Sequence, residues 1–204
     1  FQRLDNYFDV MVVDAPCSGS GLFRKDPEAI SEWSENNLQL CAQRQQRILA
    51  DVLPALKEGG ILIYSTCSYS QPEDEEIADW LTGELKMEGV KLKIVDDWGI
   101  IETASAKYNS PGYRFYPDKL KGEGFFIAVF RKGGTGVNDV KSKRSKQRKD
   151  TTGPVTAKEL PVLRPFIDPV DDLTFIRQQD DILAIPANIA DDLALIRSAL
   201  YIKK

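Results

Sequence analysis

The chain has 204 residues, of which 42% are hydrophobic and 28% are charged, and its formal net charge is −4. This balance is typical of a soluble globular protein, and we expect neither a signal peptide nor a membrane span, which needs roughly 20 apolar residues in a row. Three cysteines without close spacing and no histidine favour a reducing cytoplasm, and they predict neither a disulfide framework nor a metal site.

The first third of the chain predicts a strand followed by two helices. The apolar run from Tyr7 to Val13 is typical of a strand that is covered on both faces in a parallel sheet. Asp26 has the position of an N-cap, with a proline at the first helical position after it. After a break over residues 34–37, apolar residues recur at helical spacing as far as Leu56, which predicts a longer helix that ends at Gly59-Gly60.

The next part of the chain predicts three more strands and another helix. The strands are expected over Ile61–Tyr64, Lys91–Val95 and Phe125–Arg131, and the helix over residues 72–85. Four acidic residues fall in the first turn of this helix, where its dipole favours them: Glu73, Asp74, Glu75 and Glu76. Strands that alternate with helices of this length predict an α/β fold with βαβ units and a largely parallel sheet.

The remaining residues divide into a basic stretch and an apolar one. Residues 133–154 are polar and contain glycine, which marks a linker, and residues 155–204 resume apolar patterning but are short for an independent domain. The basic residues of the linker are Lys141, Lys143, Arg144, Lys146, Arg148 and Lys149. Such a run is either a solvated linker or a tether that contacts phosphates, and the two interpretations are compatible.

Two of the three cysteines follow predicted strands. Cys17 comes just after the first strand and Cys67 just after the second, and ligands in such sheets bind beyond the carboxyl ends of the strands. We therefore expect both thiols to share one crevice. A single cysteine more often fills the core, but the small polar neighbours and matching positions of these two favour a chemical role. Cys41 lies on the apolar face of a predicted helix, and we expect it in the core.

The residue types near the two thiols limit the chemistry. Without histidine, the chain cannot build the Cys–His pair of acyl-transfer enzymes. A thiolate can instead add to carbon-6 of a pyrimidine, which makes carbon-5 electron-rich enough to accept a methyl group. A second group must then help to remove the carbon-5 proton and to release the enzyme. Asp14, in the same turn as Cys17, fits two roles: it caps the turn, or it holds a cytosine edge or a cofactor group.

Four motifs occur in an order and rough spacing that we recognise. They are Asp14-Ala15-Pro16-Cys17-Ser18-Gly19, Phe23-Arg24-Lys25-Asp26-Pro27, Ser65-Thr66-Cys67 and Gly122-Glu123-Gly124-Phe125-Phe126. Together they resemble the NOL1/NOP2/Sun family of S-adenosylmethionine-dependent RNA cytosine-5 methyltransferases. The nearest likeness is to the bacterial RsmF-like branch, which methylates 16S ribosomal RNA. The resemblance covers residues 1–132 well, and residues 155–204 are more weakly similar to the start of that branch's C-terminal RNA-binding region.

The resemblance implies a role for each site residue. Cys67 would be the nucleophile that attacks carbon-6, and Cys17 would assist breakdown of the covalent adduct. Asp14 would contact the cofactor or the target base near the transferred methyl group, and Pro16 would line the cofactor side. The implied cofactor is S-adenosylmethionine and the implied partner is RNA, with Arg24 and Lys25 as residues that face it. The target base must be unpaired or swung out of its helix to reach such a pocket.

The family's glycine-rich cofactor loop, and the acidic residue that holds the ribose, lie upstream of the first strand of this chain. We therefore expect a fragment: the C-terminal half of a Rossmann-like class I methyltransferase domain over residues 1–132, a linker, and part of a small RNA-binding domain. Its first strand would be an exposed apolar sheet edge, which soluble proteins avoid. By itself, such a fragment would neither bind cofactor well nor turn over.

Three other functions remain open at this point. One is a transfer RNA cytosine-5 methyltransferase, and another is an RNA-binding module that retains the fold without activity. The third is an exocyclic-amine methyltransferase, whose Asn/Asp-Pro-Pro-aromatic turn would replace the Asp14–Cys17 motif and would leave Cys67 unexplained.

Overall fold

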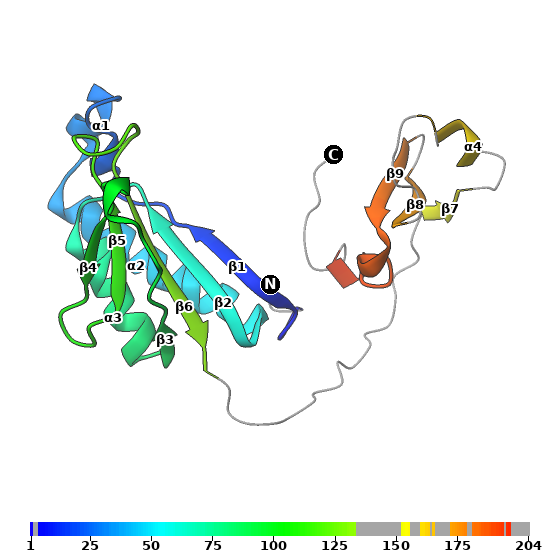
Figure 1. Cartoon of the computed structure of the whole chain (residues 1–204), viewed down its shortest axis with the longest axis horizontal. Helices are drawn as coiled ribbons and strands as arrows, with labels where there is room; N and C mark the ends of the chain where they lie inside the picture. Colours follow the sequence, from blue (N-terminus) through cyan, green and yellow to red (C-terminus); the bar gives the residue numbers. More distant parts are fainter. Residues whose placement is uncertain are drawn as a thin grey trace. The chain divides into compact units, whose positions relative to one another are not determined.

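A computed structural model describes residues 1, 4–133, 152–155, 160–163, 165, 172–178, 181–193 and 195–196. The chain divides into two compact units, Phe1–Asn138 and Asp139–Lys204 (Figure 1). The first unit contains the two cysteine motifs, and the site discussed below lies within it. In the part of the chain that the structure describes, no helix is long and apolar enough to cross a membrane.

Strands and helices alternate in the first half of the first unit, and strands dominate its second half. The strands are β1 (Phe8–Asp14), β2 (Leu56–Thr66), β3 (Met87–Gly89), β4 (Ile101–Ala104), β5 (Pro111–Phe115) and β6 (Phe125–Lys132). The helices are α1 (Pro27–Glu32), α2 (Glu35–Val52) and α3 (Glu75–Gly83), with single 3₁₀ turns at Ser20–Leu22, Leu53–Ala55, Gln71–Glu73 and Asp96–Trp98.

The six strands form one sheet in the order β1-β2-β6-β5-β4, and β3 pairs with β6. Strands β1 and β2 are parallel, and the other pairs are antiparallel. The expectation of a largely parallel sheet was therefore wrong. Parallel neighbours need a crossover of a dozen residues or more. The chain instead returns from β5 to β6 through residues 116–124, which is too short for such a crossover.

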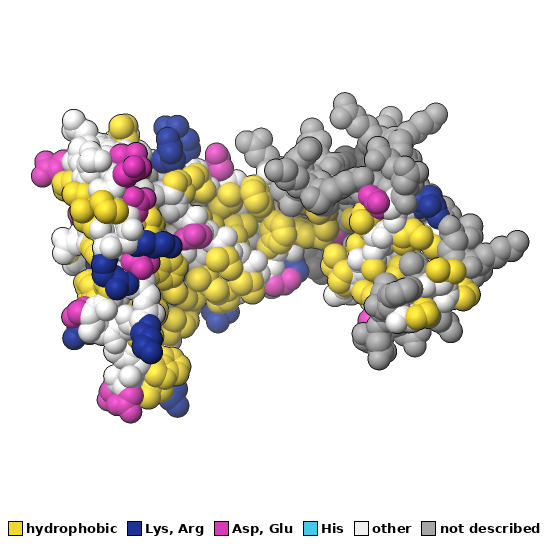
Figure 2. Space-filling view, turned by 90° about the horizontal axis from the view of Figure 1, so that it is seen from above, with side chains coloured by type: hydrophobic (Ala, Val, Ile, Leu, Met, Phe, Trp, Pro, Cys, Tyr) yellow, Lys and Arg dark blue, Asp and Glu magenta, His cyan; other side chains and the backbone are white. Residues whose placement is uncertain are grey.

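One face of the sheet is packed, and α2 and α3 lie against it (Figure 1). Met11 and Val13 of β1 point to this face and are buried. Val10 and Val12 point to the other face and are 54% and 65% exposed. The prediction that this strand is covered on both faces was wrong, whereas its position as an exposed apolar edge is confirmed for the described residues. Hydrophobic side chains are visible across the surface of this unit in Figure 2.

The predicted cap at Asp26 is confirmed, because its side chain accepts a backbone N–H at the start of α1. Ser34, in the predicted break, caps α2 in the same way. Helix α2 ends at Val52, not near Gly59, because Pro54 stops it and β2 already begins at Leu56.

The strand expected over Lys91–Val95 does not form. This segment and the 3₁₀ turn after it instead border an apolar hollow of about 240 Å³ on the sheet, beside Tyr113 and Phe115.

The second unit contains a three-stranded antiparallel sheet in the order β7-β8-β9. Its elements are β7 (Thr152–Pro154), α4 (Leu160–Leu163), β8 (Leu173–Gln178), β9 (Asp181–Pro186) and a 3₁₀ turn at Ala187–Ile189. The last three residues of the predicted linker thus belong to β7. The basic cluster lies outside the described residues.

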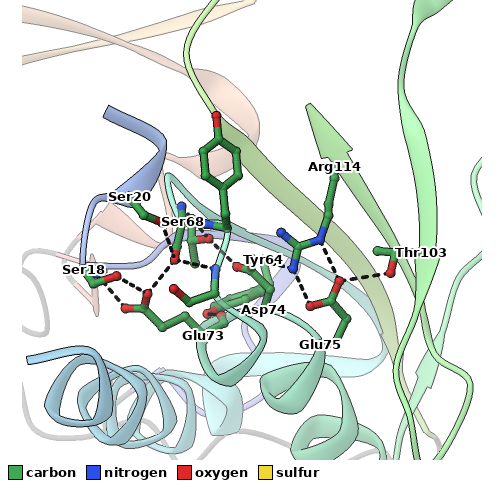
Figure 3. A network of polar contacts seen from close by, with 12 residues as sticks. Ser18, Ser20, Tyr64, Ser68, Glu73, Asp74, Glu75, Thr103 and Arg114 are labelled. Carbon is green, nitrogen blue, oxygen red and sulfur yellow. Dashed lines mark hydrogen bonds and ion pairs between the residues drawn. The ribbon is translucent and has the colours of Figure 1, made fainter. Parts of the chain in front are cut away.

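Three charged side chains join the start of α3 to the sheet (Figure 3). Arg114 of β5 donates to Glu75 through Nε (2.8 Å) and Nη2 (2.5 Å), and its Nη2 lies 3.1 Å from Oδ2 of Asp74. All three side chains are buried. Burial raises the pKa of Asp74 to about 8, although the hydrogen bond from Thr66 and the charge of Arg114 both oppose the shift. Glu75, which accepts two hydrogen bonds from Arg114, is its main ionic partner.

Replacing Arg114 by methionine should lower the free energy of unfolding by about 3–5 kcal/mol, because it leaves Glu75 buried without its cation. The matched control is Lys91→Met, which removes an exposed ion pair with Glu102 and should change stability little. Urea denaturation followed by circular dichroism measures both effects. Equal losses in the two variants would contradict this account of the core.

Candidate functional site

The two predicted cysteine turns begin at the same edge of the sheet. Asp14, the last residue of β1, pairs with Ser65 of β2, and the N–H of Ala15 donates to the carbonyl of Ser65 (2.9 Å). The parallel register reaches the carboxyl ends of β1 and β2, so the segments that follow the two strands begin side by side. Cys17 and Cys67 follow within three residues.

The thiols of these turns are in contact, as the sequence predicts. The Sγ atoms of Cys17 and Cys67 are 3.0 Å apart, both cysteines are free, and both are partly exposed. The hydrogen bond from Cys17 lowers the pKa of Cys67 to about 7, against the effect of burial. The same hydrogen bond, together with burial, raises the pKa of Cys17. Near neutral pH a substantial share of Cys67 is therefore thiolate, whereas Cys17 keeps its proton.

A buried carboxylate connects the residues that follow the two cysteines (Figure 3). Oε1 of Glu73 accepts from the N–H of Ser18 (2.7 Å), and its Oε2 accepts from the hydroxyl groups of Ser18 and Ser68 (both 2.6 Å). The Glu73 side chain is 0% exposed.

The sheet and α2 fix Glu73 in turn. The hydroxyl of Tyr64, on β2, donates to the Glu73 carbonyl (2.6 Å). Nε2 of Gln45, on α2, donates to the carbonyl of Pro16 (3.0 Å) and lies 3.4 Å from Oε1 of Glu73. These contacts tie the Cys17 turn, α2 and the end of the 71–73 turn to one another.

Two glycines, Gly21 and Gly124, allow the segment before β6 to approach the Cys67 turn. The N–H of Gly21 donates to the Cys67 carbonyl (2.9 Å), and the N–H of Gly124 donates to the Gly21 carbonyl (3.0 Å). A Cβ on Gly21 would lie 2.4 Å from the Gly124 carbonyl oxygen, and a Cβ on Gly124 would lie 2.0 Å from the Tyr69 hydroxyl. The ring of Tyr69 stacks on that of Tyr116, so aromatic side chains flank the turn.

The other predicted site residues are exposed to solvent. Asp14 is exposed, and its Oδ1 accepts a hydrogen bond from Ser65 (2.9 Å), so its carboxylate stays at the end of β1. Pro16 and Lys25 are also exposed. Arg24 forms an ion pair with Glu123 (3.1 Å).

Cys41 is buried on α2, as predicted. Among the described residues, no group of three or more metal-ligating side chains comes together.

Glu73 is a site residue that the local sequence pattern does not identify. The acidic run at 73–76 fits the first turn of a helix, where the dipole favours it, but Glu73, Asp74 and Glu75 are buried and Glu76 alone of the four is exposed. The signal that could have found them is the density of the run: four consecutive carboxylates lie between Pro72 and Ile77, shortly after the Cys67 turn. Their partners, Ser18 and Arg114, are far away in the sequence.

Comparison with known proteins connects these residues to one family. A family model described as 16S rRNA methyltransferase RsmB/F matches residues 2–131. The chain is 35% identical over 133 residues to ribosomal RNA small subunit methyltransferase F of Pectobacterium atrosepticum, a match that covers 65% of this chain and 27% of that protein. It is 36% identical over 165 residues to the protein of the same name from Aeromonas salmonicida, covering 80% of this chain and 34% of the relative. The chain thus spans about a third or less of the length of these relatives.

A solved structure supports the fold assignment. The crystal structure of a methyltransferase homolog protein from Pyrococcus horikoshii is similar with a TM-score of 0.50 and 33% identity, over 61% of this chain and 39% of that one. The sheet with its two long helices and this similarity confirm the predicted α/β, Rossmann-like methyltransferase fold.

The contact between the thiols predicts different pH profiles for alkylation. Iodoacetamide should modify Cys67 with a midpoint near pH 7 and Cys17 only at much higher pH, because the thiolate is the reactive form. In a Cys17→Ala variant the Cys67 midpoint should rise toward the ordinary thiol value of about 8.5, because its hydrogen-bond donor is gone. Peptide mass spectrometry of partially alkylated protein measures each site, and one shared profile for both cysteines would contradict the assignment.

Proposed function

Because this chain belongs to the 16S rRNA methyltransferase RsmB/F family, we propose that it carries the thiol pair of an RNA cytosine-5 methyltransferase that acts on 16S ribosomal RNA. The observation that carries the proposal is the 3.0 Å contact between Cys17 and Cys67 at the ends of two parallel strands. Covalent methylation of a pyrimidine needs a thiolate that attacks carbon-6 and a second group beside it that later removes the carbon-5 proton, and two adjacent thiols suit these two roles.

The first step uses the thiolate of Cys67. Its Sγ forms a bond to carbon-6 of an unpaired cytosine, and the electrons of the 5,6 double bond move to carbon-5. The lowered pKa of Cys67 supports this role, because the nucleophile is present at neutral pH without a histidine base.

The last step uses Cys17. After methylation, carbon-5 carries both a methyl group and a hydrogen atom, and that proton must leave before the ring regains its double bond. Once Cys67 is bonded to carbon-6 it is a thioether, so the neighbouring thiolate that raised the pKa of Cys17 is gone and Cys17 releases its proton to solvent. The Cys17 thiolate is then the neighbouring base. When it takes the carbon-5 proton, the C–S bond breaks and the electrons return to Cys67 as its thiolate.

Two exposed residues near the thiols, Asp14 and Pro16, suit a positively charged methyl donor. S-adenosylmethionine, when bound, supplies an electrophilic methyl group to carbon-5. Asp14 has an exposed carboxylate that Ser65 orients, and Pro16 is exposed beside the Cys17 turn. A carboxylate at this position fits either the amino group of cytosine or the cationic part of the donor, and Pro16 offers an apolar contact.

Substitution of each thiol in the full-length protein separates the two steps. Cys67→Ala should abolish methyl transfer to 16S ribosomal RNA, because no adduct forms. Cys17→Ala should accumulate a covalent protein–RNA adduct, because the proton on carbon-5 is not removed. Denaturing gel electrophoresis and radiolabelled methyl transfer measure the two outcomes.

The matched control is Cys41→Ala, which removes the buried thiol on α2 and leaves the pair intact. It should retain methyl transfer and form no lasting adduct. Normal turnover without adduct in the Cys17 variant would reject the two-thiol mechanism. Mapping of 5-methylcytosine in 16S ribosomal RNA, with and without the gene, tests the substrate separately.

A further inference from the structure

The carboxylate of Glu73 contacts the residue that follows each of the two cysteines, Ser18 after Cys17 and Ser68 after Cys67. We propose that Glu73 is a positioning residue that holds the two cysteine turns at the spacing that methyl transfer requires. The inference rests on the proposed function, because that reaction needs both thiols at a single base.

The chemistry of the contacts requires a carboxylate. Glu73 accepts from one backbone N–H and two hydroxyl groups, and Gln45 adds a fourth donor on the same side chain. An ionised carboxylate accepts at both oxygens and presents no hydrogen. A glutamine would turn its NH₂ group toward some of these donors. The pattern of donors therefore selects the charged side chain, not merely a polar one.

The burial of this charge points to a function. The side chain of Glu73 is 0% exposed, and its donors on Ser18, Ser68 and Gln45 carry no charge. A buried carboxylate balanced only by neutral donors is costly compared with an apolar residue of similar volume. It is retained where its contacts fix something that apolar packing cannot fix, and here they fix two turns that are fifty residues apart.

The position of Glu73 is itself determined by rigid elements. Tyr64 anchors its backbone to β2, two residues before the strand ends, and is 0% exposed. Gln45 of α2 reaches both Glu73 and the carbonyl of Pro16, directly before Cys17. The carboxylate therefore has a fixed place relative to the sheet, and the Cys17 turn is held against it from both sides.

Glu73→Gln in the full-length protein tests the proposal, with the pH profile of Cys67 alkylation by iodoacetamide as the first readout. If Glu73 holds the turns, the substitution separates them and Cys67 loses its hydrogen bond from Cys17. The midpoint of the profile then moves up toward about 8.5. The second readout is methyl transfer, for which kcat should fall about 100-fold, as for a catalytic group displaced by about 1 Å, with little change in KM for RNA.

A purely electrostatic role of Glu73 gives the opposite sign. Its negative charge raises the pKa of Cys67, so loss of the charge without movement of the turns would lower the alkylation midpoint. A downward shift, or no shift, overturns the proposal.

A double variant, Ser18→Ala/Ser68→Ala, decides the matter if Glu73→Gln does not fold. It keeps the charge on Glu73 and removes the two hydroxyl contacts. Positioning predicts an upward shift of the Cys67 midpoint here too, and an unchanged midpoint overturns the proposal.

Two neighbouring carboxylates supply matched controls. Glu75→Gln removes a carboxylate of similar burial that contacts Arg114 and neither cysteine turn, so it should lower the melting temperature but leave the Cys67 profile in place. Glu76→Gln changes an exposed residue of the same helix and should alter neither.

The two readouts also separate this inference from the proposed function. If the unsubstituted protein transfers no methyl group to RNA, the proposed function fails, but the alkylation profiles still report whether Glu73 sets the thiol contact. If methyl transfer is normal and the profile of Glu73→Gln matches that of Glu76→Gln, the positioning role alone fails.

Discussion

The parallel pairing of β1 with β2 is the constraint on which the site depends. In an antiparallel pair, the residues that follow the two strands would leave at opposite ends of the sheet. The parallel register from Val10–Ile61 to Asp14–Ser65 instead brings both exits together, and the thiols meet there at 3.0 Å. It is the sole parallel pair in the described sheet.

Local patterns in the sequence were enough to predict the elements that carry the cysteines. The apolar runs of β1 and β2, the cap at Asp26 and the burial of Cys41 all depend on residues within one or two turns of each other. The proximity of Cys17 and Cys67 followed from a general rule about the ends of parallel strands and needed no knowledge of side-chain contacts.

The rest depended on long-range contacts that a local pattern does not contain. The acidic run after Cys67 satisfies the rule for a helix start, but its partners Ser18 and Arg114 lie 55 and 39 residues away from Glu73 and Glu75. The direction of β6 depends on the short return through residues 116–124, and the hairpin of β4 and β5 depends on the turn through residues 105–110. A pattern of apolar residues predicts that a strand forms, but it does not predict whether the strand runs parallel or antiparallel to its neighbours.

The alternate exposure along β1 has a consequence for how this polypeptide behaves in solution. Val10 and Val12 present hydrocarbon to water on a strand that, among the described residues, pairs along one side only. Each square ångström of such surface favours burial by roughly 25 cal/mol, and an unpaired strand edge offers backbone donors and acceptors to any extended segment. The apolar face and the open edge of β1 therefore both favour its association with a further extended segment.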